Sequence, residues 1–197
     1  MDKILELDRE IFLELNSSFH NPWLDQLMMF LSTTMAWIPL YLILLYVLVK
    51  NFRKETWIVL LAVGLTILLA DQVTSTFMKP FFERLRPTHD PELGGMVNIV
   101  NQYRGGKYGF ASSHAANTFG ISTLMWLLLK NFRPWIGLLF LWPITVGYSR
   151  IYLGVHYPGD ILAGYLVGFL SALVGYFLFV FVKNLMNRKT ALRSGSQ

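Results

Sequence analysis

Hydrophobic residues along the chain gather in five long runs that are separated by short polar segments. An α-helix needs about 20 mostly apolar residues to cross the hydrocarbon core of a bilayer, so each run predicts a transmembrane helix. The runs cover residues 24–49, 57–78, 112–129, 134–149 and 160–182. The pattern therefore predicts an all-α integral membrane helix bundle, which occupies 24–183 of a single domain that covers 1–197.

The N-terminal segment has a different pattern. Apolar residues recur there at helical spacing, with acidic and basic residues between them: Ile4, Leu7, Ile11, Phe12, Leu15 and Phe19. One apolar and one charged face are typical of an amphipathic helix that lies in the membrane interface. We therefore expect an interfacial helix over 1–22, because its charges disfavour a sixth span. A basic start followed by an apolar core is missing, so no cleavable signal peptide is predicted.

Composition strengthens the membrane interpretation. Hydrophobic residues make up 54% of the chain and charged residues only 15%, whereas soluble domains carry about a quarter of charged residues. The net charge of +5 arises largely in short segments beside the apolar runs, which favours a bilayer over nucleic acid as the partner. Cysteine is absent, which excludes disulfides, thiolate catalysis and cysteine-ligated metals.

Lysine and arginine in short loops indicate the orientation. Nine of them follow the first, third and fifth runs, and eight lie on the opposite face. If three of those eight belong to a functional site, only five remain as orientation signals, and the count of basic residues on the two faces becomes nine against five. The N-terminus is then outside and the C-terminal tail, 184–197, is cytoplasmic, with disorder expected from residue 188. We expect a multi-pass protein of the plasma (inner) membrane.

Three polar segments lie on the outer face in this topology. They are KPFFERLRP at 79–87, GFASSHAA at 109–116 and SRIYLGVHYPGD at 149–160. Together they bring the following candidate site residues to one membrane surface: Lys79, Arg86, Ser112, Ser113, His114, Arg150, His156 and Asp160.

The cations among these residues suit a phosphate group. The guanidinium groups of Arg86 and Arg150 match the geometry of phosphate oxygens, and Lys79 adds a compact charge. The segment 112–114 stands at the first turn of a helix, where free N–H groups and the helix dipole favour an anion. The alternative for Lys79 and Arg86 is that they are ordinary interfacial anchors.

The histidines suit phosphoryl transfer. His156 and Asp160 are four residues apart, so the carboxylate can orient one imidazole nitrogen and leave the other as a nucleophile. His114, from another helix, can protonate the leaving oxygen. His114 as a helix cap and Asp160 as a favourable charge at a helix start are the alternatives. The joint arrival of complementary groups from three segments favours a site on the outer, extracytoplasmic face.

The motifs K-x6-RP (79–87), ASSH (111–114) and SR-x5-H-x3-D (149–160) resemble the three-part signature of the type 2 phosphatidic acid phosphatase superfamily. This superfamily includes membrane lipid phosphatases and the soluble vanadium haloperoxidases. The first and third motifs match in full. In the second, Ala111 stands in place of the usual proline and Ser113 in place of the usual glycine. If that position needs a positive φ, serine is strained there.

The resemblance implies a lipid phosphatase that uses no metal and no other cofactor. It implies that His156 forms a phosphohistidine, that Asp160 orients and charge-balances it, and that His114 acts as general acid and then as base. It assigns the remaining candidates to the phosphoryl oxygens: Lys79, Arg86, Ser112, Ser113 and Arg150.

The sequence leaves the substrate open among undecaprenyl diphosphate, phosphatidylglycerophosphate, phosphatidate and the phosphates of lipid A. We expect a phosphorylated lipid and the bilayer as partners, with no nucleic acid and no obligate protein partner. A transporter or flippase that binds phosphorylated lipids without cleaving them is the alternative. A haloperoxidase fits less well, because five lipid-length runs suit a membrane substrate.

Three further polar features stay open. Asp71 lies within the second run, where it either supports the phosphate cradle by pairing with a cation or ties helices together. Arg104 and Lys107 in the loop 88–110 either contact a headgroup or belong to a solvated loop. The acids and histidine within 89–92 lack the spacing of helical metal ligands, so no metal site is predicted there.

Overall fold

The structure is a computed structural model that describes residues 2–18 and 20–194. It contains α-helices, short 3₁₀ turns and one π-helix, with no β-strand in the described residues, which confirms the all-α prediction. Phe19 of the predicted amphipathic pattern lies outside the described residues. The α-helices are α1 (Asp2–Ser17), α2 (Pro22–Leu31), α3 (Ile38–Phe52), α4 (Thr56–Asp71), α5 (Lys79–Phe82), α6 (Ser113–Leu129), α7 (Leu141–Tyr152) and α8 (Pro158–Ser194).

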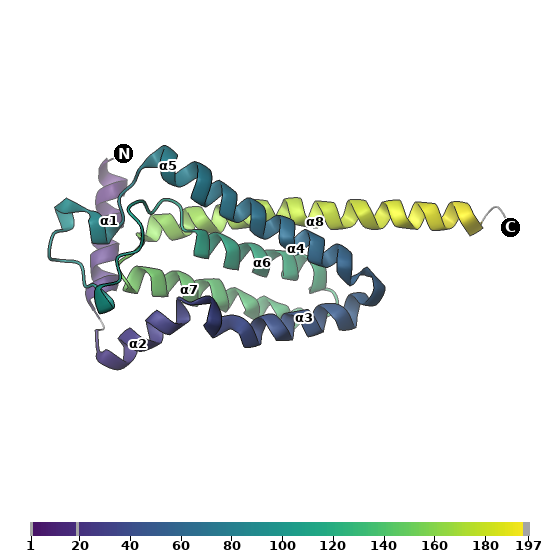
Figure 1. The fold of residues 1–197 in the computed structure, drawn as a ribbon, viewed down its shortest axis with the longest axis horizontal. Coiled ribbons are helices and arrows are strands. Elements are labelled where there is room, and N and C mark those ends of the chain that lie inside the picture. Colours follow the sequence, from purple (N-terminus) through teal and green to yellow (C-terminus); the bar gives the residue numbers. More distant parts are fainter. Residues whose placement is uncertain (1, 19, 195–197) are drawn as a thin grey trace.

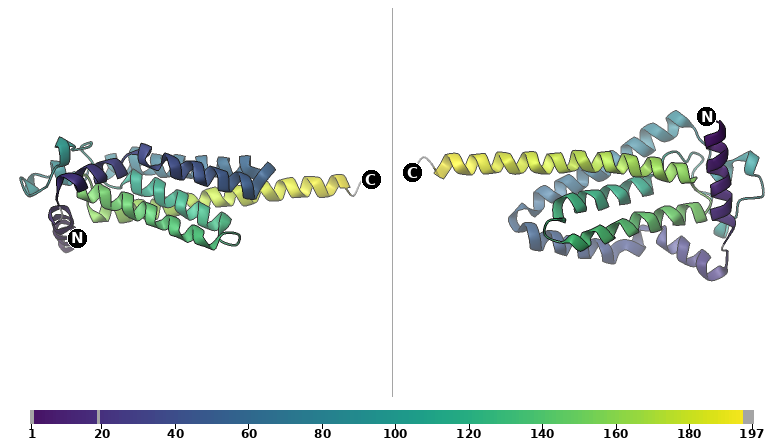
Figure 2. Two further views of the ribbon diagram at one scale, coloured as in Figure 1. Left: turned by 90° about the horizontal axis from the view of Figure 1, so that it is seen from below. Right: turned by 180° about the vertical axis from the view of Figure 1, so that it is seen from behind.

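The longer helices form an elongated bundle (Figure 1). Helices α3, α4, α6, α7 and α8 run along its long axis, and α1 lies across one end (Figures 1 and 2). The N-terminus lies at that end, whereas the C-terminus lies far beyond the opposite end. Each predicted apolar run therefore contributes a helix to the bundle.

Two stretches of the described residues are helical, long and apolar enough to cross a membrane by themselves. They are Thr34–Phe82 and Pro158–Arg188, each with an 18-residue segment whose mean hydropathy is 1.9 and 2.3, respectively. Helices α6 and α7 are shorter and pack within the bundle. The protein is thus a membrane-type helix bundle, and its five crossings stay a prediction.

The first apolar run, predicted as one helix over 24–49, is divided in two. Helix α2 ends at Leu31, a 3₁₀ turn covers Thr34–Trp37, and α3 begins at Ile38. Pro39 stands in the first turn of α3, where its missing N–H costs nothing because that group has no partner within the helix. The prediction of a continuous helix was therefore wrong.

Helix α4 continues through the π-helix Gln72–Met78 into α5, which ends at Glu83 in the left-handed conformation with φ 48°. Single π-turns inside α-helices occur frequently at functional sites. This continuous segment carries Lys79 to the end of the bundle that α1 crosses.

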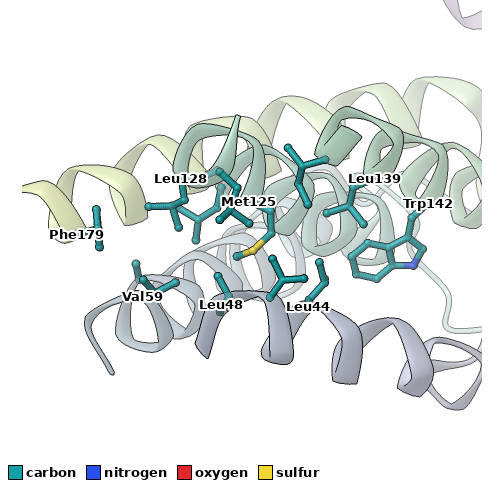
Figure 3. Packing of buried hydrophobic residues seen from close by; sticks show 14 of the residues in the cluster. Leu44, Leu48, Val59, Met125, Leu128, Leu139, Trp142 and Phe179 are labelled. Carbon is teal, nitrogen blue, oxygen red and sulfur yellow. The ribbon is translucent and has the colours of Figure 1, made fainter. Parts of the chain in front are cut away.

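The main hydrophobic core lies between these helices (Figure 3). It joins side chains from α3, α4, α6, α7, α8 and the 3₁₀ segment before α7, with Trp142 among the buried rings. Its labelled members are Leu44, Leu48, Val59, Met125, Leu128, Leu139, Trp142 and Phe179.

Helices α6 and α8 approach each other closely through glycines. A Cβ atom added to Gly168 would lie against the carbonyl oxygen of Ala116 and 2.9 Å from the amide nitrogen of Gly120. One turn earlier, a Cβ atom on Gly164 would meet the carbonyl oxygen of Ser112 at 2.5 Å. Small residues allow such close backbone contact between membrane helices. This packing brings the beginning of α6 beside the beginning of α8.

Helix α8 extends well beyond the predicted end at residue 182. It continues to Ser194 and projects past the rest of the bundle (Figure 1). The predicted disorder of 188–194 was therefore wrong, and 195–197 lie outside the described residues.

We expect Gly168→Ala to lower the stability of the folded protein. The added methyl group meets backbone atoms that cannot move aside, and overpacking of this kind costs about 1–3 kcal/mol. Gly64→Ala on α4 is the matched control, because a Cβ atom there meets nothing within 4 Å. The apparent melting temperature in detergent should fall for the first variant and stay level or rise for the second. Equal melting temperatures would contradict the close α6–α8 contact.

Candidate active site

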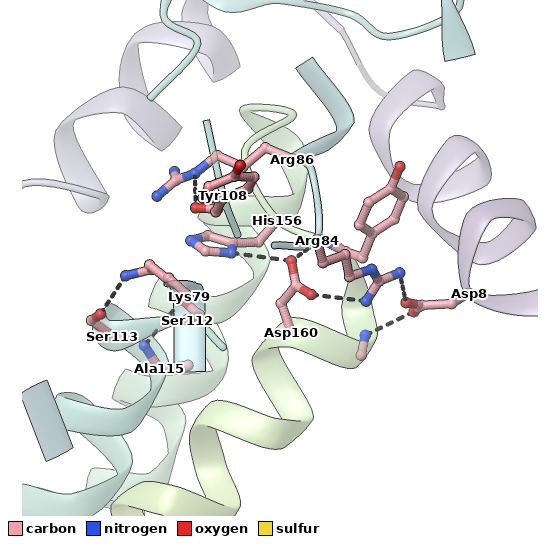
Figure 4. Close-up of polar contacts among 12 residues, drawn as sticks. Asp8, Lys79, Arg84, Arg86, Tyr108, Ser112, Ser113, Ala115, His156 and Asp160 are labelled. Carbon is pink, nitrogen blue, oxygen red and sulfur yellow. Dashed lines mark hydrogen bonds and ion pairs between the residues drawn. The ribbon is translucent and has the colours of Figure 1, made fainter. Parts of the chain in front are cut away.

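The structure brings the three polar segments together at the end of the bundle that α1 crosses (Figure 4). The first segment comprises α5 and the residues after it, the second leads into α6, and the third joins α7 to α8. Backbone contacts join them directly, since the Ser112 N–H donates to the carbonyl oxygen of Asp160 at 3.0 Å. All of the predicted site residues therefore lie at the same end of the bundle.

His156 and Asp160 form a buried pair. Nδ1 of His156 lies 3.3 Å from Oδ2 of Asp160, and the side chains are 1% and 0% exposed. The Tyr157 N–H also donates to Oδ2 at 3.1 Å, which fixes the carboxylate. Gly109 lies so close that a Cβ atom there would be 2.9 Å from the same oxygen. The pair is held rigidly, with little free space around it.

The surroundings of His156 favour a neutral imidazole. Burial lowers the pKa of His156 well below its ordinary value, and the positive charges of Arg86, Arg150 and Lys79 lower it further. A backbone hydrogen bond with Gly109 acts in the opposite direction. A neutral ring that donates from Nδ1 to the carboxylate keeps a lone pair on Nε2. The geometry therefore suits a nucleophilic histidine.

Two arginines keep nitrogen atoms that have no acceptor among the described residues. Nε of Arg86 donates to the carbonyl oxygen of Tyr108 at 3.0 Å, while its buried Nη1 has no partner. Arg150 donates to the hydroxyls of Ser32 and Tyr103, the latter at 3.1 Å, while its buried Nε has no partner. Buried donors without acceptors are costly, and phosphate oxygens are strong acceptors. Both arginines are thus prepared for an anion.

Ser113 holds Lys79 in place. Nζ of Lys79 donates to Oγ of Ser113 at 2.7 Å, and the hydroxyls of Thr74 and Ser75 each lie 2.9 Å from the same Oγ. Ser113 is absent from the residues with positive φ, so the strain considered for serine at this position does not arise. Ser112 has a different role, because its Oγ accepts from the Ala115 N–H at 3.5 Å and caps α6.

His114 is exposed to a cavity of about 610 Å³ that opens between α3, α4 and α6. Asp71, Asn117 and Thr118 also line this cavity, and the remainder of the lining is mainly apolar. An imidazole here is open to a ligand, in contrast to the enclosed His156.

The structure gives the surroundings of the polar residues whose roles the sequence left open. Asp71 accepts a long hydrogen bond of 3.4 Å from Ser75, and no cation forms a salt bridge with it among the described residues, so the first of its two open roles has no contact to support it. Arg104 donates to the Thr88 carbonyl oxygen at 3.1 Å. Lys107 lies over the ring of Tyr108, with Nζ 5.2 Å from its centre.

The acidic residues of the loop pair with a basic residue of α1. Arg9 donates to Asp90 at 3.3 Å and also to Glu92. Among the described residues, no group of three or more His, Asp and Glu side chains is arranged to hold a metal ion.

Sequence reasoning missed four residues that support the site. Arg84 joins Asp160 to Asp8 of α1, and Ser32 and Tyr103 hold Arg150. The sequence offered one signal for Arg84, because it is a further basic residue within the first motif, between Lys79 and Arg86. Nothing in the local pattern marks Asp8, Ser32 or Tyr103, because their partners are distant in the sequence.

Residues 55–185 match the family model of the PAP2 superfamily. The chain belongs to this superfamily. The match confirms the resemblance to the type 2 phosphatidic acid phosphatases that the motifs indicated. It covers all three motifs and α8 as far as residue 185.

Two similar relatives are each named lipid A 4′-phosphatase. The protein from Bacteroides thetaiotaomicron is 38% identical over 88% of this chain and 77% of its own length. The protein from Porphyromonas gingivalis is 39% identical over 91% of this chain and 74% of its own length.

Two solved structures have the same fold. LpxE from Aquifex aeolicus superposes with a TM-score of 0.62 at 28% identity, covering 86% of this chain and 94% of its own. A PAP2-type phosphatidylglycerolphosphate phosphatase from Bacillus subtilis has a TM-score of 0.63 at 22% identity, covering 93% and 88%, and shows the fold alone. Family and relatives together identify the chain as a phosphoric ester hydrolase of the membrane lipid phosphatase type.

Lowering the pH from 7 to 5 should destabilise the wild-type protein more than a His156→Gln variant. The unfolded chain takes up a proton on this imidazole below its ordinary pKa of about 6.5, whereas the folded chain has a lower pKa. The free energy of unfolding is therefore unaffected above about pH 6.5 and falls below it, by at most about 1.4 kcal/mol per pH unit. Apparent melting temperatures in detergent at the two pH values measure this difference. Equal acid sensitivity of both proteins would contradict a neutral, buried His156.

Proposed function

We propose that the protein hydrolyses a phosphate ester of lipid A through a phosphohistidine on His156, without a metal ion. One observation carries this proposal: the buried His156–Asp160 pair lies close to three cations, and two of these cations have buried N–H groups without acceptors among the described residues. Such a site offers a nucleophile and an anion cradle together, which is what phosphoryl transfer requires.

The reaction proceeds in two displacements. Nε2 of His156 attacks phosphorus, Asp160 holds the Nδ1–H and balances the charge of the ring, and His114 gives a proton to the leaving sugar oxygen. A water molecule then transfers a proton to His114 and attacks the phosphohistidine, which releases inorganic phosphate and restores the ring. His114 thus serves first as acid and then as base.

The protein's own side chains supply the positive charge. Arg86, Arg150 and Lys79 neutralise the phosphoryl oxygens, with the N–H groups at the beginning of α6 as further donors. Ser112 contributes by capping this helix, and Ser113 by holding Lys79. Electrostatic stabilisation of this kind requires no metal.

A lipid substrate is supported by the cavity beside His114, whose lining is mainly apolar. Lipid A is favoured among phosphorylated lipids by the two relatives that carry the name lipid A 4′-phosphatase. More distant relatives are named phosphatidylglycerophosphatase B and undecaprenyl-diphosphatase, at 26% and 30% identity.

We place the site on the extracytoplasmic side of the inner membrane. The site and α1 lie at one end of the bundle and the C-terminus of α8 lies at the other, as an odd number of crossings requires (Figure 1). The excess of lysine and arginine on the opposite side supports a cytoplasmic C-terminus.

The wild-type protein should release phosphate from purified lipid A in detergent with a chelator present. His156→Ala should reduce kcat by at least about 10³-fold, because the nucleophile is lost. His114→Ala should reduce it by about 10²–10⁴-fold, because the general acid and base is lost. Vanadate should inhibit, since it mimics the five-coordinate phosphoryl group.

Phosphatidylglycerophosphate, phosphatidate and undecaprenyl diphosphate belong in the same assay, because they test the choice of lipid. Comparable turnover by folded His156→Ala would contradict the nucleophile. Loss of wild-type activity with the chelator would contradict metal independence. Binding of lipid phosphates without any release of phosphate would favour the transporter or flippase.

A further inference from the structure

Helix α1 is seated firmly on the site while it exposes an apolar face. Phe12 and Asn16 are fully buried, and the ring of Phe12 packs edge-on against Tyr157 with 5.3 Å between the ring centres. Ile4 and Leu7 on the other face are 73% and 55% exposed. A helix is therefore present in the segment predicted as amphipathic, but it ends at Ser17 and not at residue 22, and its place in the membrane interface stays a prediction. This helix is also part of the tertiary structure around the site.

A chain of charged groups joins this helix to the His–Asp pair (Figure 4). Nη1 of Arg84 lies 2.8 Å from Oδ1 of Asp160, and its Nη2 lies 2.6 Å from Oδ2 of Asp8. The guanidinium also lies over the ring of Tyr157, 4.2 Å from its centre. The second oxygen of Asp8 accepts from the Gly159 N–H at 2.7 Å. Both ends of this chain are therefore fixed.

The charges in this chain have opposite effects on the imidazole. Transfer of a phosphoryl group to His156 makes the ring positive, and the negative charge of Asp160 stabilises it. Arg84 alone would cancel that charge, because it binds the other oxygen of the same buried carboxylate. Asp8 returns one negative charge, so the three groups together carry a net charge of −1.

We propose that Asp8 and Arg84 are positioning residues for the reaction. Arg84 directs Oδ2 of Asp160 toward the imidazole by holding Oδ1, and Asp8 preserves the negative charge that the phosphorylated ring needs. The N-terminal helix thereby completes the site. This inference rests on the proposed phosphohistidine mechanism.

Asp8→Asn and Asp8→Glu separate this role from a structural one. Asparagine keeps an acceptor for Arg84 and for the Gly159 N–H but loses the charge, whereas glutamate keeps the charge. We expect Asp8→Asn to lower kcat about 10-fold with KM changed by less than about twofold, and Asp8→Glu to recover most of the activity. Steady-state phosphate release and apparent melting temperature are measured on the same full-length preparations.

Arg9→Gln is the matched control, because Arg9 ties the same helix to Asp90 and Glu92 without reaching Asp160. Its kcat should stay within about twofold of wild type. If Asp8→Asn and Arg9→Gln lower kcat equally and in proportion to melting temperature, Asp8 only anchors α1 and the inference is wrong. Unchanged kcat in Asp8→Asn also overturns it. Failure of the wild-type protein to hydrolyse any lipid phosphate would instead contradict the proposed function.

A separate observation concerns the cavity between α3, α4 and α6. Its apolar lining includes Tyr41, Leu44, Leu48, Val63, Ile67 and Met125, and it reaches Ser113 and His114 at the site. Asp71 lines the cavity with a single long hydrogen bond, from Ser75. The nearby Oδ1 of Asn117 is buried and has no donor among the described residues. The carboxylate of Asp71 therefore has room for further hydrogen bonds, and Oδ1 of Asn117 has no donor among the described residues. A carboxyl group with so few partners is costly among membrane helices.

We infer that this cavity takes the acylated part of the lipid substrate, with Asp71 and Asn117 accepting hydrogen bonds from its hydroxyl or amide groups. Lipid A carries such donors on its sugar and its acyl linkages near the phosphate, whereas a polyprenyl phosphate carries none on its chain. The two acceptors thus favour the donor-bearing lipid. This inference rests on the proposed lipid phosphatase activity and concerns only its specificity.

Asp71→Ala and Asn117→Ala test this specificity. We expect the ratio of kcat/KM for lipid A to kcat/KM for undecaprenyl diphosphate to fall about 10-fold in each variant. Gln72→Ala is the control, since the neighbouring Gln72 is exposed and outside the cavity lining; its ratio should match that of wild type. An equal loss toward both lipids would make Asp71 a structural tie and overturn the inference, as would an unchanged ratio. Absence of hydrolysis of both lipids by wild type would contradict the proposed function instead.

Discussion

The hydrogen bonds and the ion pair of Asp160 hold together the end of the bundle at which the candidate site lies. Its two oxygens meet His156, the Tyr157 N–H and Arg84, and its backbone carbonyl accepts from Ser112. Each of the three motif segments therefore touches this one residue. A fully buried carboxylate is tolerated because charged and hydrogen-bonded partners surround it. The same partners fix the orientation of the imidazole.

The close packing of α6 and α8 makes this convergence possible. Glycines at the contact allow the two backbones to approach, so the first turn of α6 lies beside Asp160. The beginning of α6 and the His156–Asp160 pair are thereby joined through Asp160. The place of the first turn of α6 beside Asp160, on which the proposed site depends, thus follows from a feature of backbone packing.

The sequence could predict the helical runs, the amphipathic N-terminal helix and the composition of the site. Long apolar runs predict membrane helices directly, and the residue types within the three compact motifs indicate an anion site with a histidine–carboxylate pair. The break between α2 and α3 was harder, because the apolar pattern continues across Thr34–Trp37 while the backbone changes direction. Contacts such as Ser32 with Arg150 or Asp8 with Arg84 depend on tertiary packing between segments far apart, which no local pattern encodes.

Ser113 has a consequence for the mobility of Lys79, which we propose to bind phosphoryl oxygens. The family usually has glycine at this position, where a hydroxyl group is absent. Here the hydroxyl fastens the Lys79 ammonium and is itself fastened by Thr74 and Ser75 on the π-helix. Because of these hydrogen bonds, the Lys79 side chain has already lost much of its rotamer freedom during folding. When an anion binds to this ammonium group, less side-chain conformational entropy is lost, so binding has a smaller entropic cost.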